Sequence, residues 1–212
     1  MGAARLSAKI PFTPARVAAD RFMTPVPLIV GLGGTNRPGS TSERALQTAL
    51  AHAASQGCDT LAFTGGLLPA EIYDPSLTQR SGEALALVDA LRRADGLIVA
   101  TPAYHGGVSG LVKNALDFAE DLRSDERIYL EGRAVGCIVC ADGAQAMGST
   151  LAALRAVVHA LRGWPTPYGA TLNSTHQPFG GDGRTADAAA VQACAMVAQD
   201  VVSFATMRRA LR

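Results

Sequence analysis

The stretch Val26-Pro-Leu-Ile-Val-Gly-Leu-Gly33 runs directly into Gly34-Thr-Asn-Arg-Pro-Gly-Ser-Thr-Ser42, and these two segments decide the fold. The first is an apolar run of strand length, and the second is a polar, glycine-containing turn that opens into a segment of helical period. A strand that passes through such a turn into a helix is the first half of a β-α-β unit. The sequence therefore predicts an α/β fold that begins at Val26.

Apolar strands and helical segments keep alternating after this first unit. Further strands are predicted at residues 60–64, 96–101 and 134–140, with a fifth near 167–172. Apolar residues at helical spacing predict helices at residues 42–56, 82–94, 109–121, around 151–161 and around 191–201. The expected fold class is therefore α/β, with a doubly wound, five-stranded parallel sheet. Ligands of such sheets bind beyond the carboxyl ends of the strands, which places function in the loops 33–41, 102–108 and 141–147.

Length and composition limit the function classes. A chain of 212 residues that is 48% hydrophobic can bury the core of one domain. We expect residues 1–25, which charges and prolines interrupt, to be an N-terminal tail, and residues 26–212 to be the domain. The balance of 19 basic against 18 acidic residues disfavours nucleic-acid binding, and no apolar run approaches a membrane span. Four scattered cysteines are too few to brace a secreted fold, which favours a cytoplasmic protein.

The first loop combines the features of an anion site. The N-terminus of a helix offers unpaired backbone N–H groups and the positive end of the helix dipole. Arg37 adds a full charge, and hydroxyl donors come from Thr35, Ser40, Thr41 and Ser42. The alternative is a capping box, in which Ser40 and Glu43 only begin the helix and the glycines only make the turn.

Two commoner nucleotide-binding loops do not fit this segment. A P-loop needs a lysine before its serine or threonine, and the segment has none. The dinucleotide pattern Gly-x-Gly-x-x-Gly would begin at Gly31 and Gly33 but meets Asn36 at its third glycine. The predicted second strand also ends in Thr64 rather than in an acidic residue that would bind ribose. An NAD-binding Rossmann domain is therefore disfavoured.

The second and third loops carry fewer specific features. Tyr104, after the third strand, lies along a flat ligand ring or else packs on a neighbouring loop. His105 beside it is interpreted as a solvated loop residue, and Lys113 with Asp117 as a surface ion pair at helical spacing. The third loop offers small residues and amides to the edge of a heterocycle.

The cysteines and histidines show no metal-binding pattern. Cys137 and Cys140 are three residues apart on a predicted strand, so their side chains point to opposite faces, which suits neither a zinc site nor a disulfide. His52 and His159 have no cysteine or carboxylate at ligand spacing. We therefore expect no metal, and because no cysteine falls within the three loops, we expect no catalytic thiol.

Two of these loops together resemble the NADPH-dependent FMN reductase family. Residues 34–42 are similar to its phosphate loop, Gly-Ser-x-Arg-x-x-Ser, with Thr35 and Asn36 at the positions of the commoner serine and apolar residue. Residues 94–104 and 109–117 read Ala-Asp-Gly-Leu-Ile-Val-Ala-Thr-Pro-Ala-Tyr and Ser-Gly-Leu-Val-Lys-Asn-Ala-Leu-Asp, and they are similar to its second signature. The similarity extends over residues 26 to about 174.

The resemblance implies a flavodoxin-like fold with strand order 2-1-3-4-5, FMN as the cofactor and NADPH or NADH as the hydride donor. It also implies a homodimer or homotetramer. By position, the phosphate would be held by Thr35, Arg37, Ser40, Thr41 and Ser42. The isoalloxazine ring would be lined by Pro102, Ala103, Tyr104, His105 and Gly106, with Asp142, Gly143 and Gln145 near its pyrimidine edge. Hydride transfer to N5 of FMN needs no protein acid or base, so we assign no catalytic residue.

Three functions from different classes follow. The favoured one is an NAD(P)H-dependent flavin reductase that passes electrons to free flavin, which a partner monooxygenase would use, or to a quinone, an azo dye or a metal oxyanion. The alternatives are a flavodoxin-type electron carrier, which the near-neutral charge disfavours, and a non-redox protein that binds sugar phosphates. In the oligomer, the predicted contact is the apolar segment with Leu67, Leu68, Pro69, Ile72 and Tyr73.

Overall fold

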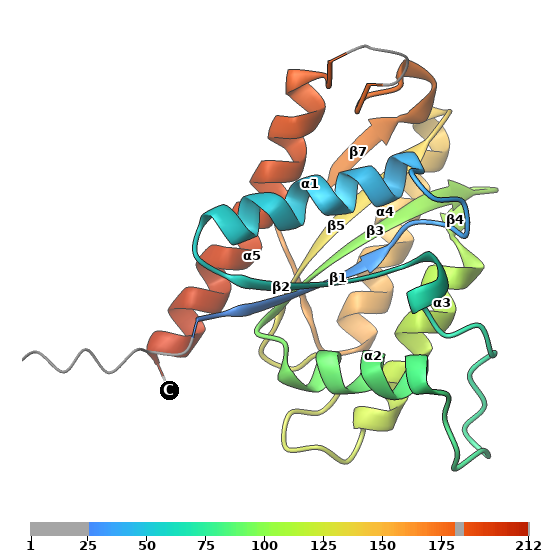
Figure 1. The fold of residues 1–212 in the computed structure, drawn as a ribbon, viewed down its shortest axis with the longest axis vertical. Helices are drawn as coiled ribbons and strands as arrows, with labels where there is room; N and C mark the ends of the chain where they lie inside the picture. The colour runs from blue at the N-terminus through green and yellow to red at the C-terminus, as the bar shows by residue number, and fades with distance from the viewer. Residues whose placement is uncertain (1–25, 181–184, 212) are drawn as a thin grey trace, which may run out of the picture.

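A parallel sheet crosses the centre of the computed structural model, which describes residues 26–180 and 185–211 (Figure 1). Its long strands are all parallel and lie in the order β2 (Asp59–Thr64), β1 (Leu28–Gly33), β3 (Gly96–Tyr104) and β5 (Ala134–Ala141). Two short strands, β6 (Trp164–Pro165) and β7 (Ala170–Asn173), pair in parallel with the beginning and the end of β5. The predicted order 2-1-3-4-5 is confirmed, with the fifth position divided between β6 and β7. Pro165 and Pro167 interrupt this edge because proline has no N–H for the ladder.

Helices cover both faces of the sheet. On one face lie α1 (Thr41–Ser55) and α5 (Ala188–Ala210), and on the other lie α2 (Gly82–Arg93), α3 (Gly110–Asp117) and α4 (Ala144–Ala160). Short 3-10 turns follow β2, α3 and β7, at Gly65–Leu67, Phe118–Leu122 and Ser174–His176. The helix predicted over 109–121 therefore ends at Asp117. The loop predicted over 141–147 is also shorter than expected, because α4 begins at Ala144.

Helix α5 is a core helix of this layered fold. In the described part of the chain it is the one helix long and apolar enough to cross a membrane by length and composition. It lies against the sheet at two strand glycines, where a Cβ on Gly96 would stand 2.5 Å from Val201 and one on Gly136 would stand 2.4 Å from Val197. These glycines let the helix approach the strands closely. Composition alone would allow α5 to span a membrane, so its assignment to the core rests on this packing against the sheet.

The side chains of β5 separate into the two cores. Cys137 packs with the layer of α2, α3 and α4, and Cys140 packs with the layer of α1 and α5. The prediction that the two thiols point to opposite faces is confirmed. All four cysteines are buried and free of disulfides.

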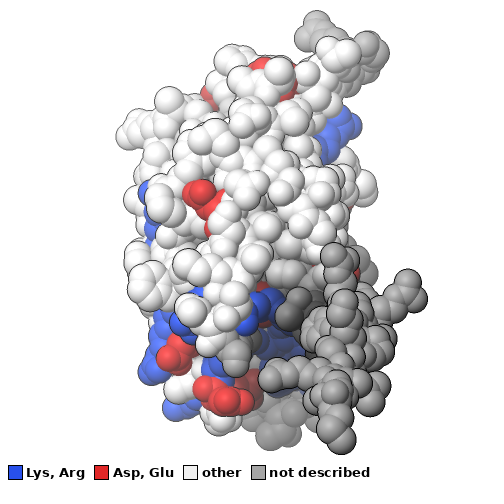
Figure 2. Space-filling view, turned by 90° about the vertical axis from the view of Figure 1, so that its left-hand side faces the viewer, with Lys and Arg blue, Asp and Glu red and all other residues white. Residues whose placement is uncertain are grey.

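Charged side chains of both signs are mixed on the side of the molecule that carries the amino ends of the strands. Figure 2 shows lysine and arginine next to aspartate and glutamate over the lower part of this side, and few charges above it. Ion pairs such as Arg92 with Asp125 and Arg93 with Asp89 lie among the described residues. The described residues visible on this side therefore form no purely basic stripe of the kind that binds nucleic acid.

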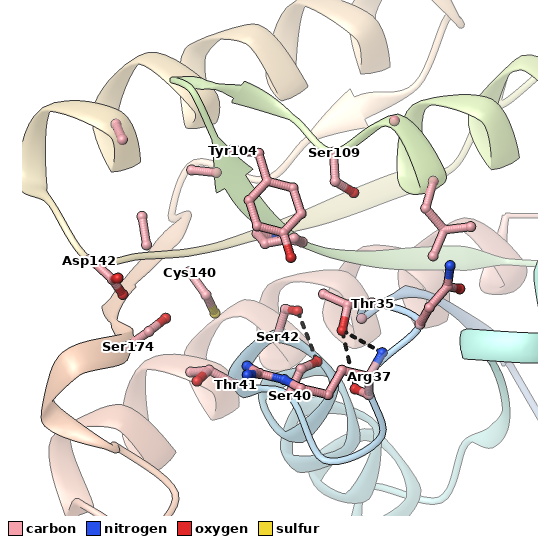
Figure 3. A pocket seen from close by; sticks show the side chains of 18 of the residues that line it. Thr35, Arg37, Ser40, Thr41, Ser42, Tyr104, Ser109, Cys140, Asp142 and Ser174 are labelled. Atoms are coloured by element: carbon pink, nitrogen blue, oxygen red, sulfur yellow. Dashed lines mark hydrogen bonds between the residues drawn. The ribbon is translucent and has the colours of Figure 1, made fainter.

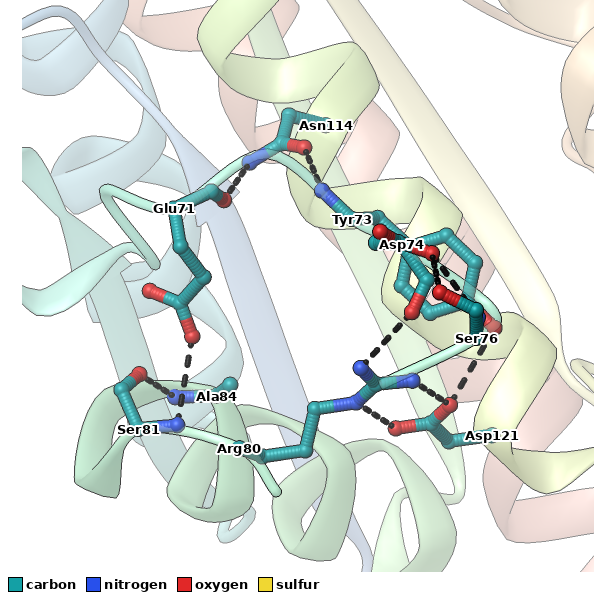
Figure 4. A network of polar contacts seen from close by, with 9 residues as sticks. All are labelled: Glu71, Tyr73, Asp74, Ser76, Arg80, Ser81, Ala84, Asn114 and Asp121. Carbon is teal, nitrogen blue, oxygen red and sulfur yellow. Dashed lines mark hydrogen bonds and ion pairs between the residues drawn. The ribbon is translucent and has the colours of Figure 1, made fainter. Parts of the chain in front are cut away.

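A network of polar contacts holds the long connection between β2 and α2 (Figure 4). The Asn114 side chain on α3 accepts from the Tyr73 N–H at 2.9 Å and donates to the Glu71 carbonyl at 2.8 Å. Arg80 makes two hydrogen bonds of 2.8 Å to Asp121, and its guanidinium lies 4.8 Å from the centre of the Tyr73 ring. This connection is therefore an ordered part of the fold.

The same contacts correct the predicted oligomer contact. Leu68 is 2% exposed and belongs to the core, and Tyr73 is half-buried with its ring edge against Phe118. Leu67 and Ile72 remain exposed at 58% and 78%. Only these two apolar side chains of the predicted segment, Leu67 and Ile72, are therefore available to a partner.

The Arg80–Asp121 pair predicts how stability depends on pH. The hydrogen bonds from Arg80 hold the pKa of Asp121 below its usual value of 3.8, so the pair stabilises the fold above that pH and is lost as the pH falls through the folded pKa. We expect Asp121→Asn to lower the free energy of unfolding by about 1 kcal/mol at pH 7. The deficit should shrink as the pH drops below 3.8, as urea unfolding at several pH values will measure. A deficit that stays constant with pH would contradict this assignment.

Candidate functional site

A cavity of about 740 Å³ opens at the carboxyl ends of β1, β3 and β5 (Figure 3). All the site residues predicted from the sequence line it except His105, Gly106 and Gln145. The lining also includes residues outside that prediction, which are Gly34, Asn36, Ser109, Gly110, Leu111, Cys140, Ala141, Ala146 and Ser174. The three predicted loops therefore meet around one cavity.

The first loop leaves β1 through two glycines because it passes close to β3. A Cβ at position 33 would stand 2.2 Å from the Ala100 carbonyl oxygen, which no side chain could accommodate. The next N–H, of Gly34, donates to that same oxygen at 3.2 Å, and Gly34 has a left-handed φ of +83°. The glycines thus fix the path of the loop against the sheet, and they direct residues 35–42 into the cavity.

Ser40 caps α1 and also faces the cavity. Its hydroxyl oxygen accepts from the Glu43 N–H at 3.3 Å, and the Glu43 carboxylate accepts from the Gly39 N–H at 2.6 Å. The capping interaction considered as the alternative is therefore present, although Glu43 bonds to the residue before the cap. Ser40 and Ser42 are buried, with their hydroxyl oxygens 3.4 Å apart. Capping and anion binding are compatible here, because a cap leaves the remaining N–H groups of the first turn open.

The second loop is a tight β-hairpin, which the sequence analysis missed. β4 (Gly107–Val108) folds back antiparallel on the end of β3, with Tyr104 paired to Gly107. His105 and Gly106 form the two-residue turn with φ values of +51° and +78°, as a type I′ turn requires. Their place at the tip explains why they do not line the cavity. The His-Gly pair is a weak signal for this turn, because histidine is enriched at positive φ among residues other than glycine.

Hydrogen bonds hold the base of this hairpin. The Ser109 N–H donates to the buried Thr101 hydroxyl at 3.1 Å, and the Ser109 hydroxyl caps α3 by accepting from the Val112 N–H. At the tip, Ser149 of α4 donates to the Gly106 carbonyl at 3.0 Å. Lys113 pairs with Asp117 on the surface of α3, as predicted. The hairpin is thus tethered at both ends.

Tyr104 extends from the end of β3 over the cavity, opposite the first loop (Figure 3). Its side chain is 59% exposed, so it is not packed into a neighbouring loop. We expect Tyr104→Ala to change the affinity for a flat ligand in this cavity, because the variant loses the ring face that the ligand contacts. Fluorescence titration with FMN and riboflavin will measure the effect. Unchanged affinity and turnover in the variant would show that this ring does not contact the ligand.

The third side of the cavity comes from β5 and the turn after β7. Asp142 and Gly143 line it as predicted, whereas Gln145 lies on the first turn of α4 and outside the lining. Ser174 reaches the cavity from the segment that the sequence indicated only as a loop.

Cys140 also lines the cavity, although it lies on β5 and outside the three predicted loops. Burial raises the pKa of this thiol to about 12, so it is protonated at neutral pH and is not a nucleophile. No group of three or more histidine, cysteine or acidic residues that could hold a metal ion occurs in residues 26–180 and 185–211.

The shape and chemistry of the cavity fit a flat ligand with a phosphate tail. Hydroxyls, Arg37 and the first N–H groups of α1 gather at one end, and the other end is formed by the Pro102–Tyr104 backbone and the Tyr104 ring. A volume of about 740 Å³ lies within the range of pockets that hold cofactors. A doubly wound sheet with such a cavity at its switch point defines the flavodoxin-like class of mononucleotide-binding proteins.

Comparison with known proteins identifies the family within this class. The sequence pattern that defines the NADPH-dependent FMN reductase family matches residues 27–177, and the chain belongs to this family. An iron-sulfur flavoprotein from Archaeoglobus fulgidus is 30% identical over 132 residues, which cover 59% of this chain and 67% of that protein. An NADPH azoreductase from a Bacillus species is 39% identical over 59 residues, which cover 27% of this chain and 32% of the azoreductase.

Solved structures share the fold at lower sequence identity. The NAD(P)H:(acceptor) oxidoreductase FerB from Paracoccus denitrificans has a TM-score of 0.65 at 19% identity, with 86% of this chain and 99% of that chain covered. This likeness agrees with the flavodoxin-like architecture described above.

Proposed function

We propose that the cavity binds FMN with its phosphate at the N-terminus of α1 and its ring against the Pro102–Tyr104 segment. The protein is an NAD(P)H-dependent FMN reductase of the family that its sequence defines. When bound, FMN supplies the hydride chemistry, taking a hydride from the nicotinamide and passing electrons on to an acceptor. The observation that carries the placement is the gathering of buried Ser40 and Ser42, Thr41 and Arg37 at one end of the cavity.

The residues of the chain bind and orient in this proposal. Backbone N–H groups and hydroxyls of the first loop hold the phosphate, and the glycines at 33 and 34 let that loop approach β3. The hairpin presents backbone and the Tyr104 ring to one side of the flavin. The open mouth of the cavity leaves room for nicotinamide and then for an acceptor. We assign no acid or base to the chain.

Turnover of NADPH and NADH tests this proposal and separates it from the alternatives. The protein loaded with FMN should oxidise NAD(P)H steadily when free FMN or a quinone is supplied. Bound FMN with no steady turnover would indicate an electron carrier instead. Failure to bind FMN while sugar phosphates bind would indicate the non-redox alternative.

The acceptor is proposed by class. Free flavin, a quinone, an azo dye and a metal oxyanion can all react at the open side of the cavity, and the partial likeness to an NADPH azoreductase supports the azo dye as one of them. Flavin released to a partner monooxygenase is a further use of the same activity. Four free, buried thiols support a reducing, cytoplasmic setting.

We further propose a homodimer or homotetramer, because a cavity open on one side gains a wall from a neighbour. Leu67 and Ile72 are the exposed apolar side chains that support a contact near the β2–α2 connection. Light scattering at micromolar concentration tests this, and Ile72→Lys should reduce the measured mass. A monomeric wild-type protein would contradict the proposal.

A further inference from the structure

A second, smaller hollow of about 210 Å³ adjoins the main cavity beside the first loop. The two hollows share Arg37, Thr41 and Ser174, all of which are labelled in Figure 3. The smaller one continues away from the ring end of the main cavity, toward Arg44 on the first turns of α1 and toward the segment of Gln177 to Gly180. It is therefore an extension of the ligand site past the place proposed for the FMN phosphate.

Among residues 26–180 and 185–211, two guanidinium groups and no acidic residue line this hollow. Neither Arg37 nor Arg44 has a carboxylate within ion-pair distance among residues 26–180 and 185–211. The nearby Glu43 carboxylate accepts hydrogen bonds from the Gly39 N–H and from the side chains of Gln47 and Thr64. Two guanidinium charges against this one carboxylate leave a net positive charge among the described residues around the hollow, which suits an anion.

Arg44 is held in place while part of its hydrogen-bonding capacity stays open. Its Nη1 donates to the Gly180 carbonyl at 2.9 Å and lies 3.5 Å from the Phe179 carbonyl. Its Nη2 and Nε lie 3.5 Å and 3.8 Å from the Cβ position of Gly39, so the guanidinium stands over the first loop. Nε and Nη2 of Arg44 have no hydrogen-bond partner among residues 26–180 and 185–211, so this edge of the guanidinium can bind a phosphate oxygen pair.

We propose that this hollow binds the 2′-phosphate of NADPH and that Arg44 sets the preference for NADPH over NADH. The inference rests on the proposed function, because the nicotinamide must reach FMN in the main cavity while its adenosine phosphate lies in the adjoining hollow. An arginine beside a nucleotide site is a common means of accommodating a 2′-phosphate. Arg37 lines both hollows, so it would lie between the two phosphates and offset part of their negative charge.

The ratio of kcat/KM for NADPH to kcat/KM for NADH tests the proposal on the FMN-loaded protein. Arg44→Gln should lower this ratio about tenfold, the value of one charge-assisted hydrogen bond at an exposed site. Arg44→Lys keeps the charge and should recover part of the ratio. Arg123→Gln is the matched control, because Arg123 is a 72% exposed arginine that lines neither hollow. This variant should leave the ratio unchanged. An unchanged ratio in Arg44→Gln would overturn the proposal.

A binding measurement separates failure of this inference from failure of the proposed function. In calorimetry, 2′,5′-ADP should bind at least about tenfold more tightly than 5′-AMP to the wild-type protein, and Arg44→Gln should remove the difference. This arm needs no turnover, so it reports on the hollow even if NAD(P)H is not oxidised. Equal binding of the two nucleotides would overturn the inference.

The hollow could instead bind the negative charge of an anionic electron acceptor. A third experiment distinguishes this acceptor from the 2′-phosphate of NADPH. With NADPH as donor, we compare a neutral quinone and a sulfonated azo dye as acceptors in wild type and Arg44→Gln. The proposal expects the KM for NADPH to rise with both acceptors and the KM for the dye to stay the same. A rise confined to the KM of the sulfonated dye would assign the hollow to the acceptor and overturn the proposal.

Discussion

Arg37→Ala should weaken FMN binding about tenfold or more and leave riboflavin binding unchanged. The reason is that a charge-assisted hydrogen bond to phosphate is worth roughly 1.5–3 kcal/mol, and riboflavin has no phosphate to lose it. Arg37 lines both cavities and is exposed, so its removal leaves the buried core intact. Titration of the protein with each flavin, followed by fluorescence, measures the two dissociation constants.

Two comparisons make this result specific. Arg123→Ala changes an exposed arginine that lines neither hollow and should alter neither dissociation constant. Raising the salt concentration should weaken FMN more in the wild type than in Arg37→Ala, since exposed charges are screened. If Arg37→Ala weakened the binding of FMN and of riboflavin equally, the assignment of the phosphate to the first loop would be contradicted.

Arg133→Met should lower the free energy of unfolding by about 3 kcal/mol. Arg133 is 1% exposed, and its guanidinium donates to the Ala94 carbonyl at 3.0 Å, the Arg92 carbonyl at 2.8 Å and the Tyr129 carbonyl at 2.9 Å. The first two acceptors are at the carboxyl end of α2, where helix carbonyls have no partner within the helix. Methionine fills much of the same volume but leaves the Tyr129 carbonyl without this donor. The Arg92 and Ala94 carbonyls then keep only Arg127, whose Nη2 lies 2.7 Å and 3.1 Å from them.

Urea unfolding measures this loss. The urea concentration at the midpoint should fall. The slope of the unfolding free energy against urea concentration should stay the same, because the surface exposed on unfolding does not change. Arg162→Met removes a 54% exposed arginine and should cost less than about 0.5 kcal/mol. A loss below about 1 kcal/mol in Arg133→Met would show that other groups or water satisfy the freed carbonyls.

The order of the sheet and the place of the cavity were predictable because both depend on local patterns. The apolar run at 28–33 and the polar turn that follows it contain the strand, the turn and the helix start within a dozen or so residues. The strands β3 and β5 are buried along nearly their whole length, which produces continuous apolar segments in the sequence. The rule that ligands bind at the carboxyl ends of such strands then located the three loops.

The features that were missed depend on contacts between distant residues. Ser174 lies at the cavity only because β7 pairs with the end of β5. Cys140 lies there because the last two residues of β5 line the cavity. Leu68 is buried by α2 and α3, which no pattern near residue 68 indicates. The burial of Arg133 is likewise not indicated in the sequence, because two of its acceptors, Ala94 and Arg92, lie about 40 residues earlier in the chain.

Anaerobic mixing of the FMN-loaded protein with NADPH tests the central claim most directly. The claim is that the cavity holds FMN in a position where the nicotinamide can reach it. We expect the visible absorption of the bound flavin to bleach in a single turnover and to return when a quinone or oxygen is admitted, and we expect bleaching to slow in Tyr104→Ala. A protein that binds FMN but leaves it oxidised in the presence of excess NADPH and excess NADH would contradict the claim.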